Sequence, residues 1–188
     1  LAEEFVSGES FVVGFGDTIV TSSGPRGVVA RLIEDHEASG AAATIAVWEV
    51  PPEEASKYGV IRPAVADPVG AFPIDDIVEK PPLGEAPSHL AVAARYVFTP
   101  KIFEAIAATD PGVKGELWLT DAIRRLLEWG DDVRCVRLLD GERRYDIGTP
   151  LTYYRAFADF ALADPEHGTA FAEYLRTCLQ EEGGGAAG

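Results

Sequence analysis

The sequence predicts an α/β protein with a doubly wound, mostly parallel sheet that is truncated at its N-terminus and ends in C-terminal helices. A strand-like run at residues 10–20, a helical pattern at 24–40 and a second strand-like run at 43–50 follow one another as in a right-handed βαβ unit. Residues 149–180 have the apolar spacing of helices. The chain starts at Leu1 and contains no Met, so we expect it to be part of a longer protein.

The first three elements are indicated by residue type and by helix signals. The run "SFVVGFGDTIV" is rich in β-branched and aromatic residues, and we expect this strand to end at Gly16 or Asp17. In "GPRGVVARLIEDHEASG", Pro25 suits a first helical turn and Gly40 a helix stop. The run "ATIAVWEV" then predicts the second strand.

The middle of the chain is divided by Pro and Gly into short segments. They predict a strand, a turn and a strand in residues 64–81, a long apolar strand at 88–98, and helices at 99–109 and 119–130. Thr120 is the expected cap of the second helix.

The C-terminal third begins with a turn signal and ends in helices. Asp140-Gly141 lies between two strand-like runs and predicts a tight hairpin. Two helices are expected to be separated near Asp164-Pro165, and the Gly-rich residues 181–188 to form a disordered tail. Residues 1–180 are therefore expected to form a single domain.

Composition excludes several kinds of function. The 188 residues carry a net charge of −15, which argues against a nucleic-acid surface because a polyphosphate backbone binds a basic face. No apolar run reaches the roughly 20 residues of a membrane span, and no leader opens the chain, so we expect no membrane contact and a cytoplasmic location. The few Cys and His residues lack metal-ligand spacing, so a metal would have to bind carboxylates.

Two acidic residues at strand ends are candidate metal ligands. Asp17 follows a strand at the edge where open α/β sheets bind ligands, although an Asp in "GDT" is equally typical of a turn. Asp146 stands before Gly148, which allows a ligand to approach, and it could also pair with Arg143 or Arg144.

Three other residues are candidates for binding a sugar phosphate. Glu79 and Lys80 alternate sides at a strand end, so one could face a sugar hydroxyl and the other a phosphate; a strand-terminal Glu-Lys pair is more often a solvated edge. Gly59 is a turn residue by default, and it could also present bare backbone amides to a sugar.

The stretches "FGDTIV", "EVPPEEASKYGVI", "IVEKPP", "APSHLAVAARYVFTPKIFEAI", "GELWLTDAIRRLL" and "RRYDIGTPLTYYRAFADFALADPEHG" occur in a collinear order. Together they resemble the bacterial UTP-glucose-1-phosphate uridylyltransferases, also called UDP-glucose pyrophosphorylases. The resemblance implies a Rossmann-like nucleotidyltransferase fold and the Mg²⁺-dependent reaction of UTP with glucose 1-phosphate to give UDP-glucose and pyrophosphate. It also implies a homo-oligomer.

The resemblance also implies residue roles. Asp17 and Asp146 match the two carboxylates that hold Mg²⁺. Gly59 and Glu79 match residues around the sugar, and Lys80 matches the catalytic cation on its phosphate. The chain departs from the family pattern at three positions, where His89 replaces Asn, Ala94 replaces Gly, and Trp118 replaces Gln.

The family's Gly-rich nucleotide loop has no counterpart, because no "GGxGTR"-like stretch occurs in the sequence. We therefore expect the chain to carry the metal and sugar-phosphate half of a site, to be inactive alone and to self-associate. Two alternatives stay open: a non-catalytic sugar-phosphate-binding or assembly module, and a transferase for another nucleotide and sugar.

Overall fold

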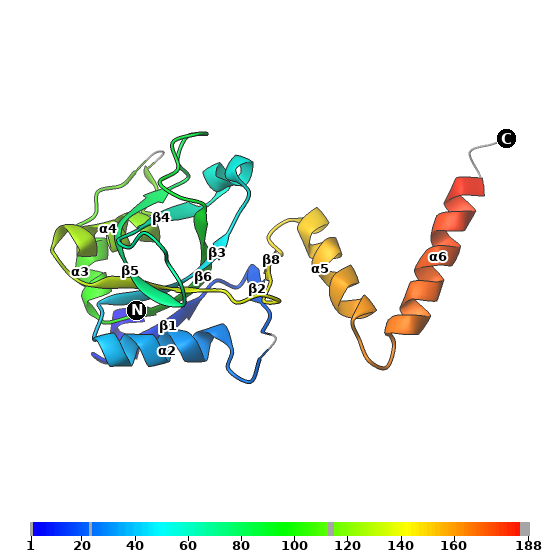
Figure 1. The fold of residues 1–188 in the computed structure, drawn as a ribbon, viewed down its shortest axis with the longest axis horizontal. Helices are drawn as coiled ribbons and strands as arrows, with labels where there is room; N and C mark the ends of the chain where they lie inside the picture. The colour runs from blue at the N-terminus through cyan, green and yellow to red at the C-terminus, as the bar shows by residue number, and fades with distance from the viewer. Residues whose placement is uncertain (1, 23, 113–114, 185–188) are drawn as a thin grey trace. The chain divides into compact units, whose positions relative to one another are not determined.

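The computed structural model describes residues 2–22, 24–112 and 115–184. The chain is divided into two compact units, Leu1–Arg144 and Tyr145–Gly188, each of which is described by itself. The first is a large α/β unit and the second a small helical unit (Figure 1), and the single domain expected over residues 1–180 stays a prediction.

A six-stranded sheet forms the centre of the first unit. Its strand order is β1-β6-β3-β7-β5-β4. The strands are β1 (Phe11–Gly14), β3 (Ala43–Glu49), β4 (Gly59–Pro63), β5 (Ala71–Glu79), β6 (Leu90–Phe98) and β7 (Val133–Arg137). The strand expected to end at Gly16 or Asp17 ends at Gly14, and β2 (Thr18–Val20) lies outside this sheet.

The expectation of a mostly parallel sheet was wrong. The β3–β7 pair is parallel, whereas the pairs β1–β6, β3–β6, β4–β5, β4–β6 and β5–β7 are antiparallel. The reason lies in the connections: a parallel pair needs a crossover of a dozen or more residues, and only residues 64–70 separate β4 from β5. The βαβ pattern in the sequence covers only residues 10–50, so it gave no information on the direction of β4 and β5.

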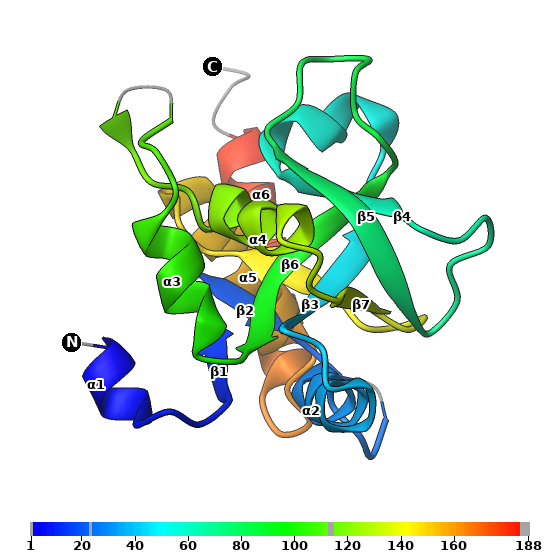
Figure 2. The same cartoon turned by 90° about the vertical axis from the view of Figure 1, so that its left-hand side faces the viewer.

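Helices cover both faces of the sheet. Side chains alternate along a strand, so Ile45 and Val47 face one way and Ala46 faces the other. Helix α2 (Val28–Ser39) packs on the face of Ala46 through Leu32. Helices α3 (Lys101–Ala107) and α4 (Leu119–Glu128) pack on the opposite face (Figure 2). The described part of the unit also contains the short helices α1 (Ala2–Val6) and η1 (Pro52–Lys57).

Strand β6 contains an irregularity at Ala94. The register of the β3–β6 pair shifts between Ile45 and Val47, and Ala94 has a φ of 53°. A positive φ is strained for any residue with a Cβ and favours Gly. The resemblance indicated Gly at this position, and the backbone conformation gives a physical reason for that preference.

The hairpin expected at Asp140-Gly141 is not formed by the strands that flank it. A turn is present, with the N–H of Glu142 donating to the carbonyl of Leu139 at 3.0 Å. Strand β7, however, has both edges occupied, by β3 and β5. The chain that leaves the turn bonds beside β2 instead, where the N–H of Thr21 donates to the carbonyl of Arg143 at 2.9 Å.

The short strand β8 (Arg144–Asp146) begins at the last residue of the first unit, and two helices follow it in the second unit. Helix α5 (Pro150–Leu162) begins with a capping box between Thr149 and Thr152, and α6 (Gly168–Gly184) follows the predicted break at Asp164. Helix α6 extends to Gly184, and the disordered tail expected over residues 181–188 stays a prediction. Residues 185–188 of that expected tail lie outside the described residues.

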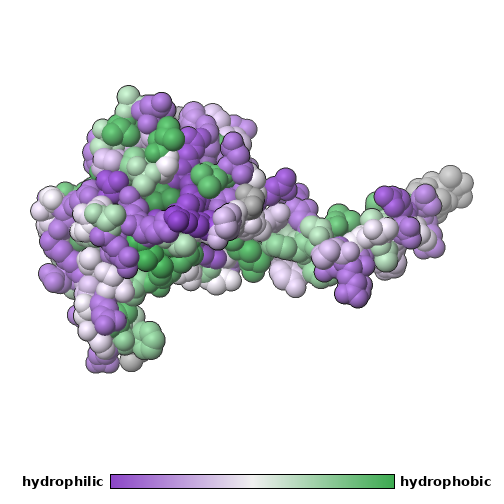
Figure 3. Space-filling view, turned by 60° about the horizontal axis from the view of Figure 1, so that its bottom comes forward, coloured by the Kyte–Doolittle hydropathy of each residue, from purple (hydrophilic) through white to green (hydrophobic). Residues whose placement is uncertain are grey.

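Large apolar side chains remain exposed on the helices of the second unit. The large apolar residues exposed on α5 and α6 include Leu151, Tyr153, Tyr154, Phe157, Phe160, Leu162, Tyr174 and Leu179. Figure 3 shows green apolar side chains among purple polar ones on the face that it draws. In the described part of the chain, no helix combines the length and the apolar character needed to cross a membrane.

A buried histidine links α2 to the sheet. His36 is 5% exposed, its Nδ1 lies 3.3 Å from Oγ1 of Thr44, and its Nε2 lies 3.1 Å from Oγ of Ser10. Burial lowers the pKa of His36 because it disfavours the imidazolium, although the charges of Asp35 and Glu37 act in the opposite direction.

We expect this lowered pKa to make the first unit less stable in acid. Above the ordinary pKa of about 6.5, His36 is neutral in both states and contributes no pH dependence. Below it, the unfolded state takes up a proton before the folded state does, so stability falls as the pH is lowered. Urea unfolding from pH 7.5 to 5.0 should show a loss of stability in the wild type that is smaller in His36→Gln. Exposed His167→Gln is the control, and equal pH profiles for all three proteins would contradict the expectation.

Candidate active site

A cavity of about 390 Å³ opens in the first unit where β4, β5 and β6 meet the start of α4. Its volume is in the range of small-molecule sites. The lining side chains come from distant parts of the sequence: Phe15, Lys57, Tyr58, Gly59, Glu79, Val92, Ala94, Tyr96, Leu117, Trp118, Leu119, Thr120 and Arg144. Aromatic walls with a few charged groups are typical of pockets that bind a polar organic ligand.

Glu79 is held firmly in this cavity. Its side chain is 16% exposed, and its Oε2 accepts a hydrogen bond of 2.7 Å from the hydroxyl of Thr120. Gly59 is opposite on β4, and a Cβ at that position would lie 3.0 Å from Oε2 of Glu79 and 3.2 Å from Oγ1 of Thr120. Gly59 therefore leaves room for this carboxylate and hydroxyl pair, which a Cβ would force to shift by a few tenths of an ångström.

Lys80 lies next to the cavity in a strained conformation. Its φ is 43°, and its N–H donates to the carbonyl of Tyr58 at 3.0 Å. Its ammonium lies 5.8 Å from the ring centroid of Trp118 and 3.8 Å from Oε1 of Glu79. Backbone strain of this kind costs of order 1–3 kcal/mol and is concentrated at functional sites. The structure thus brings the predicted residues Gly59, Glu79 and Lys80 together.

Thr120 was assigned the wrong role from the sequence. The N-cap of α4 is Trp118, which has extended backbone angles, and Thr120 lies inside the first turn. Its hydroxyl is directed to Glu79 and is not used to cap the helix. A Thr near a helix start gives the same sequence signal in both cases, so the local pattern could not separate them.

Arg144 is a cavity residue that the sequence reasoning treated as an ion-pair partner. Its guanidinium lies 5.2 Å from the ring centroid of Tyr58, and its Nη2 donates to Oγ1 of Thr18 at 3.3 Å. Tyr96 lies in the same region: burial raises the pKa of its phenol, as does the charge of Glu79, while Arg144 and Arg95 lower that pKa. Arg144 and Glu79 therefore have opposite effects on the pKa of Tyr96, which lines the same cavity.

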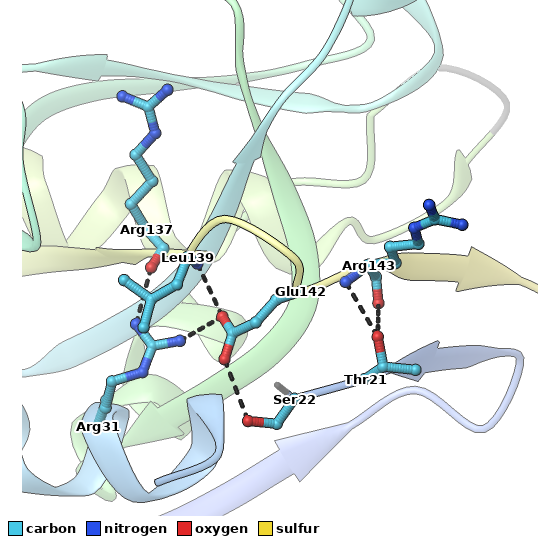
Figure 4. A network of polar contacts seen from close by, with 7 residues as sticks. All are labelled: Thr21, Ser22, Arg31, Arg137, Leu139, Glu142 and Arg143. Carbon is cyan, nitrogen blue, oxygen red and sulfur yellow. Dashed lines mark hydrogen bonds and ion pairs between the residues drawn. The ribbon is translucent and has the colours of Figure 1, made fainter. Parts of the chain in front are cut away.

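The turn before Arg144 is fixed by a buried carboxylate (Figure 4). The side chain of Glu142 is 1% exposed and forms an ion pair with Arg31 of α2, which is 16% exposed. Glu142 also accepts hydrogen bonds from the N–H of Leu139 at 2.8 Å and from the hydroxyl of Ser22 at 3.3 Å.

Arg31 and Thr21 extend this network. Nη1 of Arg31 donates to the carbonyl of Arg137 at 2.9 Å, and the N–H of Arg143 donates to Oγ1 of Thr21 at 3.1 Å (Figure 4). The turn is thus tied to α2 on one side and to β2 on the other.

The two predicted metal ligands are in different units. Asp17 is exposed between β1 and β2, where its Oδ1 accepts a hydrogen bond of 3.3 Å from the hydroxyl of Thr18. Asp146 belongs to the second unit, and its Oδ1 accepts the N–H of Gly148 at 2.9 Å.

These two carboxylates do not belong to a metal cluster built from protein side chains alone among the described residues. No group of three or more His, Cys, Asp or Glu side chains is arranged to hold a metal among the residues that the structure describes. Mg²⁺ commonly binds one or two carboxylates and completes its shell with water and substrate phosphates. The oxygen donors of Asp17 and Asp146 fit that chemistry without a protein-only cluster.

Comparison with known proteins gives consistent matches. A model described as nucleotidyl transferase matches residues 1–162. UTP–glucose-1-phosphate uridylyltransferase 2 of Streptococcus pyogenes serotype M3 is 38% identical over 170 residues, which are 88% of this chain and 54% of that protein. The chain therefore spans about half the length of the relatives that it matches.

Two solved structures are similar in fold as well as sequence. A UTP-bound UGPase from Acinetobacter baumannii has a TM-score of 0.79 and 31% identity, covering 93% of this chain and 58% of that one. A UDP-glucose pyrophosphorylase complexed with UDP-glucose has a TM-score of 0.76 and 33% identity, covering 85% and 58%.

We expect Glu142→Gln to destabilise the first unit by roughly 2 kcal/mol. Removing one partner of a buried ion pair costs about 3–5 kcal/mol, and the amide of Gln retains part of the hydrogen bonding. Urea unfolding followed by tryptophan fluorescence measures this change, because Trp48, Trp118 and Trp129 all lie in this unit.

The matched control is Glu34→Gln, which removes the carboxylate of the exposed Arg26–Glu34 pair. An exposed pair contributes about 0–1 kcal/mol, so this variant should unfold near the wild-type urea midpoint. Equal midpoints for the two variants would show that the Glu142 network does not stabilise the unit.

Proposed function

The chain belongs to the nucleotidyl transferase family, and we propose that it supplies the sugar-phosphate half of the site in a UTP–glucose-1-phosphate uridylyltransferase. In this reaction a phosphate oxygen of glucose 1-phosphate attacks the α-phosphorus of UTP, and pyrophosphate leaves. The product is UDP-glucose. Two similar solved structures, a UTP-bound UGPase and a UDP-glucose pyrophosphorylase complexed with UDP-glucose, support this choice of substrates.

The observation that carries the proposal is the grouping of Gly59, Glu79 and Lys80 at one cavity. Glu79 has one oxygen fixed by Thr120, so its carboxylate is oriented to accept a hydrogen bond from a hexose hydroxyl. Gly59 has no Cβ to crowd this carboxylate and hydroxyl pair in the cavity lining. Lys80 brings a cation to the side of this carboxylate, where the sugar phosphate would lie.

These roles match what the chemistry demands. Phosphoryl and nucleotidyl transfer need two anionic groups to be held in line, and little covalent help from the protein. Lys80 is the proposed catalytic cation, because an ammonium on the attacking phosphate reduces its repulsion from the nucleotide. The positive φ of Lys80 supports this role, because the strained backbone sets the direction in which the side chain leaves the main chain.

Mg²⁺ is part of the proposal, with Asp17 and Asp146 as its protein ligands. When bound, the ion would neutralise charge on the substrate phosphates. The support is the donor chemistry of the two carboxylates and the resemblance of "FGDTIV" and "RYDIG" to the family motifs.

We also propose that the complete protein is a homo-oligomer. The exposed aromatic and aliphatic side chains of α5 and α6 support this, because apolar surface of that kind is typical of protein contacts.

Calorimetric titration of the chain with glucose 1-phosphate tests the sugar-phosphate site. We expect binding, and a loss of affinity of roughly tenfold or more in Glu79→Gln and in Lys80→Ala, because each removes a charge-assisted hydrogen bond to the ligand. Lys101→Ala is a matched control for the lysine, since Lys101 also lies 5.8 Å from a tryptophan ring and pairs with an acid, Asp131.

The exposed Glu128, which pairs with Arg125 at the end of α4, provides the control Glu128→Gln. Absence of binding, or wild-type affinity in both site variants, would contradict the proposal. Pyrophosphate release by the complete protein with UTP, glucose 1-phosphate and Mg²⁺ separates the transferase from a module that only binds the sugar phosphate.

A further inference from the structure

Two cations line the cavity without a motif-based role, Lys57, which pairs with Glu54, and Arg144. Arg144 is the last residue of the first unit and lines the cavity together with Gly59 and Glu79. A guanidinium is always charged and presents five N–H donors in a planar fork, which matches the oxygens of a phosphate group. Glu79 lines the same cavity and can bind sugar hydroxyls, so the pair suits a ligand that has both a phosphate and hydroxyl groups.

The side chain of Arg144 is held in place before any ligand binds. Its guanidinium lies 5.2 Å from the ring centroid of Tyr58, within the range of a cation–π interaction, and one of its N–H groups donates to Thr18. Arginine has many rotamers, and an arginine that is already ordered loses less entropy on binding.

The backbone that carries Arg144 is equally constrained. The preceding residues, Glu142 and Arg143, are bonded to Arg31, Ser22 and Thr21 as Figure 4 shows. The Glu142 carboxylate therefore acts as a positioning group for Arg144 and does not itself line the cavity.

Tyr58 contacts both Arg144 and Lys80. The ring of Tyr58 contacts the guanidinium of Arg144, and its backbone carbonyl accepts the N–H of Lys80. The next residue, Gly59, faces Glu79. Arg144, Lys80 and Glu79 therefore all contact the two-residue segment 58–59.

We propose that Arg144 binds the phosphate of the hexose 1-phosphate and shares it with Lys80, while the hexose hydroxyls contact Glu79. This inference rests on the proposed function and assigns that site a phosphate ligand in addition to Lys80. The two cations have different roles: Lys80 is 57% exposed and is a point charge, whereas Arg144 is ordered by Tyr58 and Thr18 and fixes the orientation of the phosphate through its fork.

Titrations with two ligands, glucose 1-phosphate and glucose, test the assignment. Removing the guanidinium in Arg144→Gln should weaken the binding of glucose 1-phosphate roughly tenfold or more, because a charge-assisted bidentate contact is lost. The affinity for glucose, which has no phosphate, should not change. Arg144→Lys keeps the charge and loses the fork, so its affinity for glucose 1-phosphate should lie between those of wild type and Arg144→Gln.

The control is Arg26→Gln, which removes an exposed arginine whose side chain is 70% exposed and pairs with Glu34. It should bind both ligands as the wild type does. Circular dichroism and thermal melting establish that each variant is folded, and Arg144→Lys serves as the test if Arg144→Gln does not fold.

The outcomes separate the two levels of the proposal. If glucose 1-phosphate binds to the wild type and responds to Glu79→Gln and Lys80→Ala, yet binds the Arg144 variants unchanged, the role of Arg144 is refuted and the proposed function stands. A parallel loss of glucose and glucose 1-phosphate affinity in the Arg144 variants would assign Arg144 a structural role and refute phosphate binding. If the wild type binds no glucose 1-phosphate, both proposals fail.

Discussion

The buried carboxylate of Glu142 is the interaction on which the cavity depends. It joins its own turn, where it accepts the N–H of Leu139, to a region distant in sequence, where it pairs with Arg31 of α2 and accepts the hydroxyl of Ser22. A buried charge is costly unless it is paired and hydrogen-bonded, so these contacts exclude other paths for the turn. This turn places Arg144 at the wall of the cavity, where its guanidinium packs on the ring of Tyr58.

Regular packing builds the core of the first unit, whereas irregular backbone positions shape the cavity. Strand β3 supplies a fully buried centre, and the alternation of Ile45, Ala46 and Val47 allows helices to pack on both faces. The cavity lies where this regular arrangement is interrupted, at the strained Ala94 and at Lys80, both of which have positive φ. Regular packing therefore supplies the frame, and the irregular positions shape the surface that a ligand would meet.

Part of this architecture could be predicted from the sequence, because residue type and helix signals act locally. They predicted β3, α2 and the break between α5 and α6. The direction of strand pairing was not accessible, since it depends on which edges are already occupied; β7 lies between β3 and β5, so the Asp140-Gly141 turn closes no hairpin. Among the site residues, Gly59, Glu79 and Lys80 followed from the motifs. Thr120 and Arg144 did not, because a hydroxyl near a helix start indicates a cap and an arginine near an acid indicates an ion pair.

The central claim is that this cavity holds a sugar phosphate with its two ends distinguished by charge. Crystallisation of the chain with glucose 1-phosphate tests it most directly. The account predicts the phosphate between Lys80 and Arg144, with hexose hydroxyls at the Glu79 carboxylate beside Gly59. A ligand bound outside the cavity, or bound with its phosphate directed toward Glu79, would contradict it.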